Sequence, residues 1–255
     1  MLTVMSFNIR NSCDRGTEAW AARLINFVPL VKNADPDLIG FQEALPGQYL
    51  DLVRLFPEYG SVGKGRDDGA DAGERAALFY KKERLALLDT GDFWLSESPG
   101  EPSFGWDAAC IRICTHARFS DNKTGKEFAH YNTHLDHVGQ TAMLEGAKLL
   151  KSRVLAGVTP AIVTGDFNVR ERSATYKLMT QGGLSDTKYA AKSSMSYGTF
   201  HGYNPGENIA QESPIDYIFF TDGQFIISSY KVLVNGGAGC YTSDHYPVLA
   251  ELEQA

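Results

Sequence analysis

The sequence contains no long basic run. It carries 24 Lys and Arg against 31 Asp and Glu, a formal net charge of −7, and its densest basic stretch is only Lys81-Lys82-Glu83-Arg84. Proteins that bind duplex nucleic acid usually present a basic face. The charge balance argues against a general DNA-binding protein. A local groove can still be basic on an acidic protein, so nucleic acid stays among the candidate partners.

The sequence also lacks cysteines at metal-ligand spacing. Its four cysteines, Cys13, Cys110, Cys114 and Cys240, include no Cys-x-x-Cys pair, and no cluster of ligand-type residues flanks them. This argues against a structural zinc site and favours free, buried thiols, while a disulfide stays open.

Long apolar runs are absent as well. No stretch approaches the roughly 18 residues that a membrane-spanning helix needs, so we expect no membrane span. Residues 1–10 read as a β-strand rather than a signal peptide. This slightly favours a cytoplasmic location, although a signal peptide removed beforehand would leave the same beginning.

What the chain does contain is typical of a globular protein. Apolar residues make up 43% and charged residues 22% of its 255 residues, which is an ordinary balance for a packed domain. Domains that mix helices and strands often reach about 250 residues as one unit. No internal repeat or linker divides the chain, so we expect one domain over residues 1–255 and a monomer.

Hydrophobic periodicity predicts strands alternating with helices. The expected helices lie near residues 20–32, 49–56, 141–155 and 174–180. The expected strands lie near residues 2–9, 38–41, 74–80, 85–88, 110–119, 127–133, 160–164, 215–220, 225–234 and 246–252. We expect residues 74–80 and 85–88 to pair as a hairpin. Residues 60–73, 94–107, 183–212 and the Gly-rich stretch 235–240 are expected to be loops.

Polar side chains punctuate the ends of these strands. They lie at or just past strand ends or beside strand starts: Asn8, Glu43, His134, Asp166, Asn168, Asp216, Asp244 and His245. Taken singly, each has a simple structural explanation; Asn8 suits a turn, and Glu43 suits the N-terminus of a helix that starts at Pro46. Together they indicate a ligand site, because sites gather at strand ends in such folds. Carboxylate and amide oxygens favour Mg²⁺ or Mn²⁺ over Zn²⁺.

The same residues carry a resemblance to a known family. The sequence resembles the endonuclease/exonuclease/phosphatase superfamily in six ordered motifs: Ser-Phe-Asn8, Phe-Gln-Glu43, Asn132-Thr-His134-Leu, Gly-Asp166-Phe-Asn168, Ile-Asp216-Tyr and Ser-Asp244-His245. The stretches 134–139 and 198–202 resemble a bacterial branch related to deadenylase-type members. The resemblance implies a DNase I-like, four-layer α/β sandwich, with two mixed β-sheets packed face to face and helices outside. Strands apolar enough to be buried on both faces agree with it.

The resemblance also implies a metal site and an activated water. Glu43, with Asn8 nearby, would hold a divalent cation, and Asp244 would contact the metal or support His245. Asp166 and His245 would position and deprotonate water, and which of them is the base stays open. A third carboxylate, Asp216, would then fix the tautomer of His245.

Two further residues would act on the phosphate. His134 would contact the phosphate or protonate the leaving group, with Glu74 as its orienting partner. Asn168 would donate a hydrogen bond to the charge that builds on phosphorus. No activated Ser or Cys is present, so no covalent intermediate is expected.

For several other polar and aromatic residues the sequence leaves two roles open. Trp106 could line a substrate cleft or belong to a small satellite core. Arg112 could face phosphate or be paired on a strand, and His137 and His201 could touch substrate or lie on the surface. The remaining acid, Asp136, fits a turn.

The leading prediction is a metal-dependent phosphoesterase acting on a phosphodiester or a phosphomonoester. Nucleic acid, a nucleotide, a phospholipid head group and a sugar phosphate all stay open as substrates, and the loops at 94–107 and 185–212 suit a small or single-stranded one. The alternative is a catalytically inactive binding or scaffold module on the same fold, which would predict losses among the motif residues. The sequence shows none.

Overall fold

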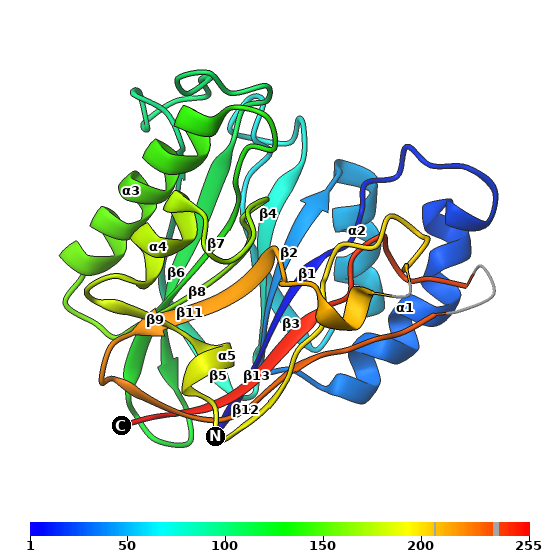
Figure 1. Ribbon diagram of the computed structural model, residues 1–255. Helices are drawn as coiled ribbons and strands as arrows, with labels where there is room; N and C mark the ends of the chain where they lie inside the picture. Colours follow the sequence, from blue (N-terminus) through cyan, green and yellow to red (C-terminus); the bar gives the residue numbers. More distant parts are fainter. Residues whose placement is uncertain (207, 237–239) are drawn as a thin grey trace.

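The computed structural model describes residues 1–206, 208–236 and 240–255. Its strands form two sheets, shown in Figure 1. The first sheet, in spatial order, contains β10 (Ser193–Met195), β12 (Phe225–Val232), β13 (Val248–Gln254), β1 (Leu2–Asn8), β2 (Leu38–Ala44), β4 (Arg75–Lys81) and β3 (Tyr59–Val62). The second contains β5 (Leu85–Trp94), β6 (Ile113–Asp121), β7 (Glu127–His134), β8 (Ala161–Asp166), β11 (Asp216–Thr221) and β9 (Leu184–Asp186).

Helices cover the outer faces of both sheets (Figure 1). They are α1 (Trp20–Ala34), α2 (Pro46–Leu55), α3 (Gln140–Ala156), α4 (Ala174–Thr180) and the short α5 (Thr187–Ala190), with single 3₁₀ turns at Gly16–Glu18 and Ile209–Gln211. In the view of Figure 1, α3 and α4 lie on one side of the sheet pair and α1 and α2 on the other.

Three apolar clusters hold these layers together. One lies between the sheets and includes Leu38, Phe119 and Val248. A second joins α1 and α2 to the first sheet through residues such as Phe27, and a third joins α3 and α4 to the second sheet through residues such as Leu150. Both sheets are mixed, since β1 pairs with β2 in parallel and with β13 antiparallel, and β8 pairs with β7 in parallel and with β11 antiparallel. The predicted four-layer sandwich is confirmed.

The predicted hairpin between residues 74–80 and 85–88 is wrong. The strand β4 pairs with β2 and β3, whereas β5 pairs with β6 in the other sheet. The short turn between them carries the chain across the sandwich, and a buried ion pair of 2.8 Å between Arg84 and Asp121 anchors it. Two strands joined by a short turn look alike in sequence whether they share a sheet or not, because the local pattern contains no information on the partner strand.

Two loop predictions also need correction. Residues 59–62 form β3, at the edge of the segment expected to be a loop. The segment 183–212 contains β9, α5 and β10, although its residue 207 lies outside the described residues. Within the Gly-rich stretch 235–240, residues 237–239 also lie outside them. These short elements carry too few residues to show a period.

A neutral polar network lies between the two sheets. The Asn132 side chain donates from Nδ2 to the carbonyls of Phe41 and Ala77 in the opposite sheet. Its Oδ1 accepts from Gln42 Nε2 at 2.7 Å and from Thr164 Oγ1 at 3.0 Å. The Thr164 hydroxyl also meets His130 Nε2 at 2.9 Å. The network ties the sheets into one rigid frame for the strand ends.

A glycine makes this close approach feasible. A Cβ atom at Gly40 would overlap Thr164 Oγ1 and Asn132 Oδ1, so only glycine leaves room for the two polar side chains on the facing sheet.

The structure shows no helix, in any of the described segments, that is long and apolar enough to span a membrane.

Candidate active site

The pairing of three strands brings three predicted residues into a row. His134 at the end of β7 lies opposite Asp166 at the end of β8, and Asp166 lies opposite Asp216 at the start of β11. Because β11 runs antiparallel to β8, its first residue meets the last residue of β8. The two kinds of position, strand end and strand start, therefore meet at one edge of the sheet.

The first sheet contributes Asn8 and Glu43, two of the residues expected to lie beside a metal ion. Asn8 Nδ2 donates to Glu43 Oε1 at 3.0 Å and to Asp166 Oδ2 at 2.9 Å, so a single amide joins the two sheets at this edge. Glu43 lies where the β2–β4 register shifts, with a backbone φ of 62°. A bulge of this kind re-aims a side chain, and a left-handed φ is costly for Glu. Its other oxygen, Oε2, accepts from the Asn11 backbone at 2.9 Å.

An imidazole and a carboxylate form the next pair. His245 Nδ1 lies 2.9 Å from Asp216 Oδ2, and both residues are buried. The opposite ring nitrogen, Nε2, lies 3.7 Å from Asp166 Oδ2. Burial lowers the pKa of His245, but the neighbouring Asp216 and Asp166 carboxylates outweigh it and raise the pKa to about 10. Asp216 therefore holds the ring with Nε2 facing Asp166.

The loop before β13 delivers this imidazole to the site. Since β13 runs antiparallel to β1, its beginning lies beside the end of β1. The Ser243 hydroxyl donates to the Asn8 carbonyl at 2.7 Å and accepts from the His245 backbone at 3.2 Å. Ser243 thus connects the last strand to the first at the site, and Asp244 lines the pocket beside it.

Asp166 lies at the centre of the cluster. Its Oδ1 accepts from the Asn168 backbone at 2.9 Å, and Asn168 has a left-handed φ of 51°. Burial, followed by the Asp216 charge, raises the pKa of Asp166 to about 7. Burial also raises the pKa of Asp244. For both carboxyl groups the largest cause is removal from water, which disfavours the charged form.

His134 and Asn168 form a polar pair on the other side of Asp166. Asn168 Nδ2 lies 3.0 Å from His134 Nε2 and donates to the Leu135 carbonyl at 3.0 Å. Burial, with the charges of Arg112 and Arg66, lowers the pKa of His134, which keeps the ring neutral. Within the described residues its Nδ1 has no hydrogen-bond partner.

Glu74 lies in the same pocket but contacts other residues than expected. It accepts from Arg66 Nη1 at 2.5 Å and from Asn11 Nδ2 at 3.2 Å. The hydrogen bonds of the described residues do not include one between Glu74 and His134, so an orienting role of Glu74 for His134 finds no support in the geometry.

These side chains surround a pocket of about 310 Å³. Its lining comprises Arg10, Asn11, Glu43, Arg66, Glu74, Cys110, Arg112, His134, His137, Asp166, Asn168, Phe200, Ile215, Asp244 and His245. Sequence reasoning missed several of these residues. Arg10 and Asn11 follow the Ser-Phe-Asn motif directly, which is a usable signal, whereas Arg66 comes from a loop with no pattern that points to the site.

Two predicted supporting residues do not line the pocket. Trp106 is half-buried and has a φ of 48°. The imidazole of His201 is buried against Tyr246, with ring centroids 4.2 Å apart, and its backbone donates to the Asp244 carbonyl. The surface alternative for His201 is therefore wrong, and His201 is not among the residues that line the pocket.

Arg112 and Asp136 have more definite places than the sequence suggested. Arg112 precedes β6, is buried, and lines the pocket. Its Nε lies 3.6 Å from Asp136 Oδ1. Asp136 is buried and accepts backbone hydrogen bonds from Ala109, Cys110, Val138 and Gly139. Its carboxylate thus holds two backbone segments together, which is more than the turn role expected from the sequence.

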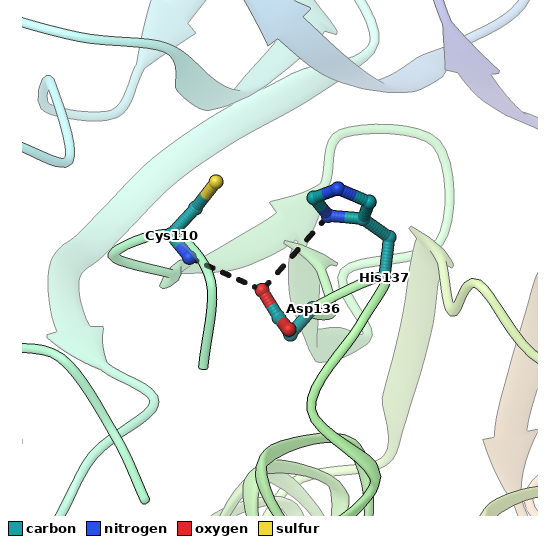
Figure 2. Close-up of side chains that lie close together, drawn as sticks. All are labelled: Cys110, Asp136 and His137. Atoms are coloured by element: carbon teal, nitrogen blue, oxygen red, sulfur yellow. Dashed lines mark hydrogen bonds and ion pairs between the residues drawn. The ribbon is translucent and has the colours of Figure 1, made fainter. Parts of the chain in front are cut away.

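Within residues 1–206, 208–236 and 240–255, two groups of side chains bring metal-ligand atoms within 4.8 Å of one another. One is Asp166, Asp216 and His245, all buried. The other is Cys110, Asp136 and His137 at the pocket wall, shown in Figure 2.

The first group could bind a metal ion. Asn8 links Asp166 of this group to Glu43, and Asp244 lines the same pocket, so several carboxylate oxygens gather at this edge. Carboxylate and amide oxygens suit a hard divalent cation, so the donors at this edge fit one.

Comparison with known proteins shows the family of this chain. The model of the endonuclease/exonuclease/phosphatase family matches residues 5–245. A mannosyl-6-phosphatase of Bacteroides thetaiotaomicron is 35% identical, with a TM-score of 0.91 over 99% of this chain and 100% of that one. An endonuclease/exonuclease/phosphatase from Bacteroides vulgatus is 38% identical, with a TM-score of 0.92 over 100% of this chain and 99% of that one.

Other similarities are more distant. The human Nocturnin catalytic domain is 18% identical with a TM-score of 0.77, covering 100% of this chain and 93% of that one, which shows a shared fold alone. An uncharacterized protein of Acanthamoeba polyphaga mimivirus is 26% identical over 163 residues, and the match spans 60% of this chain and 60% of that relative. The bacterial branch expected from the sequence is thus supported, and its likeness to a deadenylase is one of fold. The chain belongs to the endonuclease/exonuclease/phosphatase family and is a phosphoric ester hydrolase of the phosphatase or nuclease type.

Proposed function

We propose that this protein is a divalent-metal-dependent phosphomonoesterase whose substrate is a small sugar phosphate. The observation that carries the proposal is the pocket, whose volume of about 310 Å³ suits one phosphorylated small molecule. Three arginines, Arg10, Arg66 and Arg112, line that pocket on a chain whose net charge is −7. The positive charge of the site is therefore concentrated in a pocket, whereas proteins that bind nucleic acid usually carry it on an extended basic face. The mannosyl-6-phosphatase similar to this chain favours a sugar phosphate among the candidates.

Glu43, Asn8 and Asp244 are the residues that would hold the cation, Mg²⁺ or Mn²⁺. When bound, the cation supplies positive charge to a phosphate oxygen and to the leaving oxygen. Glu43 is aimed at this place by its bulge, and Asn8 is fixed by bonds to Glu43 and Asp166.

Asp166 and His245 would orient the attacking water, and Asp166 would take its proton, because the raised pKa of His245 keeps that imidazole protonated near neutral pH. Asp166 is held by Asn8 on one oxygen and by the Asn168 backbone on the other. Asp216 holds His245 so that its Nε2 faces Asp166. Geometry of this kind lets a proton leave the water as the oxygen attacks phosphorus.

Asn168 and His134 would face the phosphate. Their side chains already meet at 3.0 Å, and both line the pocket. The Asn168 amide would donate to the charge that develops on the phosphate oxygens, an interaction worth roughly 3 kcal/mol in the transition state.

A substrate panel tests the proposal. Mannose 6-phosphate, other hexose phosphates, bis-p-nitrophenyl phosphate and a single-stranded oligonucleotide would be compared with Mg²⁺, with Mn²⁺ and with chelator. We expect release of inorganic phosphate from sugar phosphates, loss of that activity in chelator, and a kcat/KM at least about 100-fold lower for the oligonucleotide. Faster cleavage of the oligonucleotide than of any sugar phosphate would contradict the proposal. No hydrolysis of any substrate would favour the scaffold alternative.

A further inference from the structure

A buried arginine at the pocket wall keeps most of its hydrogen-bond donors free. Arg112 is only 5% exposed and lines the pocket. Among the described residues it makes one hydrogen bond, from Nη2 to His137 Nδ1 at 3.1 Å, and its buried Nε has no hydrogen-bond partner. A guanidinium offers five N–H donors, so the two Nη groups of Arg112 keep N–H donors without a partner among the described residues. The pocket is the side on which a partner for them would lie.

Asp136 holds this guanidinium without using up its donors. The carboxylate takes backbone N–H groups of Ala109, Val138 and Gly139 on Oδ2 and that of Cys110 on Oδ1. Arg112 Nε lies 3.6 Å from Oδ1, close enough for attraction and too far for a good hydrogen bond. Asp136 is therefore a positioning group for Arg112.

The same contacts make a metal ion at this wall unfavourable. Figure 2 shows that Cys110 meets Asp136 through its backbone nitrogen while its thiol points away from the carboxylate. A cation bound between Asp136 and His137 would share the place with the Arg112 guanidinium, which lies 3.1 Å from His137 Nδ1. Like charges at that distance repel strongly in a buried place. The wall is built to face an anion.

The strand order shows which part of the substrate Arg112 would meet. At this edge β6, β7, β8 and β11 are consecutive neighbours, so Arg112, His134, Asp166 and Asp216 follow one another along the edge. Arg112 lies beyond His134, at the end of the row opposite Asp216. A phosphate placed against Asn168 and His134 would thus turn one oxygen toward the attacking side and another toward Arg112.

We propose that Arg112, positioned by Asp136, makes this pocket select a phosphomonoester over a phosphodiester. The inference rests on the proposed function and names the residue behind its substrate class. A phosphomonoester carries nearly two negative charges near pH 7, because its second pKa is about 6, whereas a diester carries one charge and has an esterified oxygen in place of a charged one. A guanidinium matches two phosphate oxygens at once. At this position it would therefore favour the doubly charged group.

The test compares two substrates in a set of variants. The kcat/KM values for p-nitrophenyl phosphate and bis-p-nitrophenyl phosphate would be measured in wild type, Arg112→Gln, Arg112→Lys and Asp136→Asn. For Arg112→Gln we expect the monoester value to fall about 50-fold and the diester value less than about 3-fold, as for loss of a charged hydrogen bond. Arg112→Lys should restore part of the monoester value, and Asp136→Asn should raise KM for the monoester more than it lowers kcat.

A matched control separates selectivity from stability. Arg84 forms a similarly buried ion pair with Asp121 at 2.8 Å, on the turn between β4 and β5 and outside the pocket lining. Arg84→Gln should leave the monoester-to-diester ratio unchanged even if it lowers the melting temperature. An equal fall of both substrates in Arg112→Gln, or an unchanged monoester value, would overturn the inference.

Binding of inorganic phosphate gives a second readout that does not depend on turnover. Calorimetry should show at least about tenfold weaker binding of inorganic phosphate in Arg112→Gln, with dimethyl phosphate hardly affected. If the wild type prefers the diester, the proposed function fails. If the phosphate affinity of Arg112→Gln equals that of wild type, the inference on Arg112 fails, whatever the wild type prefers.

Discussion

Two buried polar clusters lie next to each other on the same strands. The neutral network between the sheets includes Asn132 and Thr164, and the cluster at the strand ends includes His134 and Asp166. Asn132 and His134 are two residues apart on β7, and so their side chains point to the same face of the sheet. The same holds for Thr164 and Asp166 on β8. One step along a strand thus separates groups that hold the sheets together from groups that face the pocket.

The two clusters differ in the charge of their side chains and in how far the two sheets enclose them. The inner network uses amides, a hydroxyl and a neutral imidazole, which can satisfy one another inside a protein. At the strand ends the sheets stop covering the side chains, and carboxylates accumulate with pKa values raised by burial, to about 7 for Asp166. Buried charge of this kind lowers stability unless a cation or substrate compensates it. Stability and chemistry should therefore respond in opposite ways to substitutions in the two clusters.

The largest expected effect is on catalysis. Asp166→Asn should lower kcat by about 10⁴-fold, because the group that orients and deprotonates water would lose its charge. The melting temperature should stay the same or rise, since a buried carboxylate with a raised pKa is removed. Steady-state hydrolysis of p-nitrophenyl phosphate and thermal unfolding measure the two effects. A variant with wild-type kcat would remove Asp166 from the reaction.

Thr164→Val, two residues earlier on β8, should show the reverse. The change keeps the shape of the side chain, leaves the buried His130 Nε2 without its hydrogen-bond partner and removes one of the two hydrogen bonds that Asn132 Oδ1 accepts, so unfolding should be easier by about 1–3 kcal/mol. The kcat of the folded enzyme should change less than about threefold, because no group that faces the pocket is altered. Urea unfolding and kinetics at matched concentrations of folded protein would check this. A large loss of kcat with unchanged stability would mean that the two clusters do not divide in this way.

The smallest effect concerns the pH dependence of stability. Burial lowers the pKa of His130 to about 3, below the roughly 6.5 of an unfolded chain. The unfolded state therefore binds the proton first, and the stability that the neutral ring contributes is present above pH 6.5 and lost as the pH falls from 6.5 toward 3. The loss is at most about 1.4 kcal/mol per pH unit from this residue.

His130→Gln tests that slope. A glutamine keeps a donor for Thr164 and cannot take up the proton, so the free energy of unfolding should fall less steeply between pH 6.5 and 4.5 than in wild type. Urea titrations at three pH values would measure it. The buried His134 and His201 also have lowered pKa values, so some slope should persist. Equal slopes in variant and wild type would show that His130 is not titrated on unfolding.

Much of this protein could be predicted from the order of its residues. Apolar periodicity located most strands and helices, and the polar residues at strand ends pointed to Asn8, Glu43, His134, Asp166 and His245. Both signals are local: a strand shows its hydrophobic pattern, and a polar residue at its end stands out against that pattern.

Tertiary structure decided what local signals cannot contain. The pairing partner of β4 depends on which strands lie beside it, so the expected hairpin with β5 was wrong. Arg66 reaches the pocket from a loop without a pattern, and the sequence left open whether Arg112 faces phosphate or is paired on a strand. Only the folded chain shows Arg112 lining the pocket next to Asp136. The order of residues was enough to predict the family, the sandwich and the polar residues at the strand ends. Only the folded chain brings Arg10, Arg66 and Arg112 around one pocket, because a long-range contact leaves no signal in the spacing of neighbouring residues.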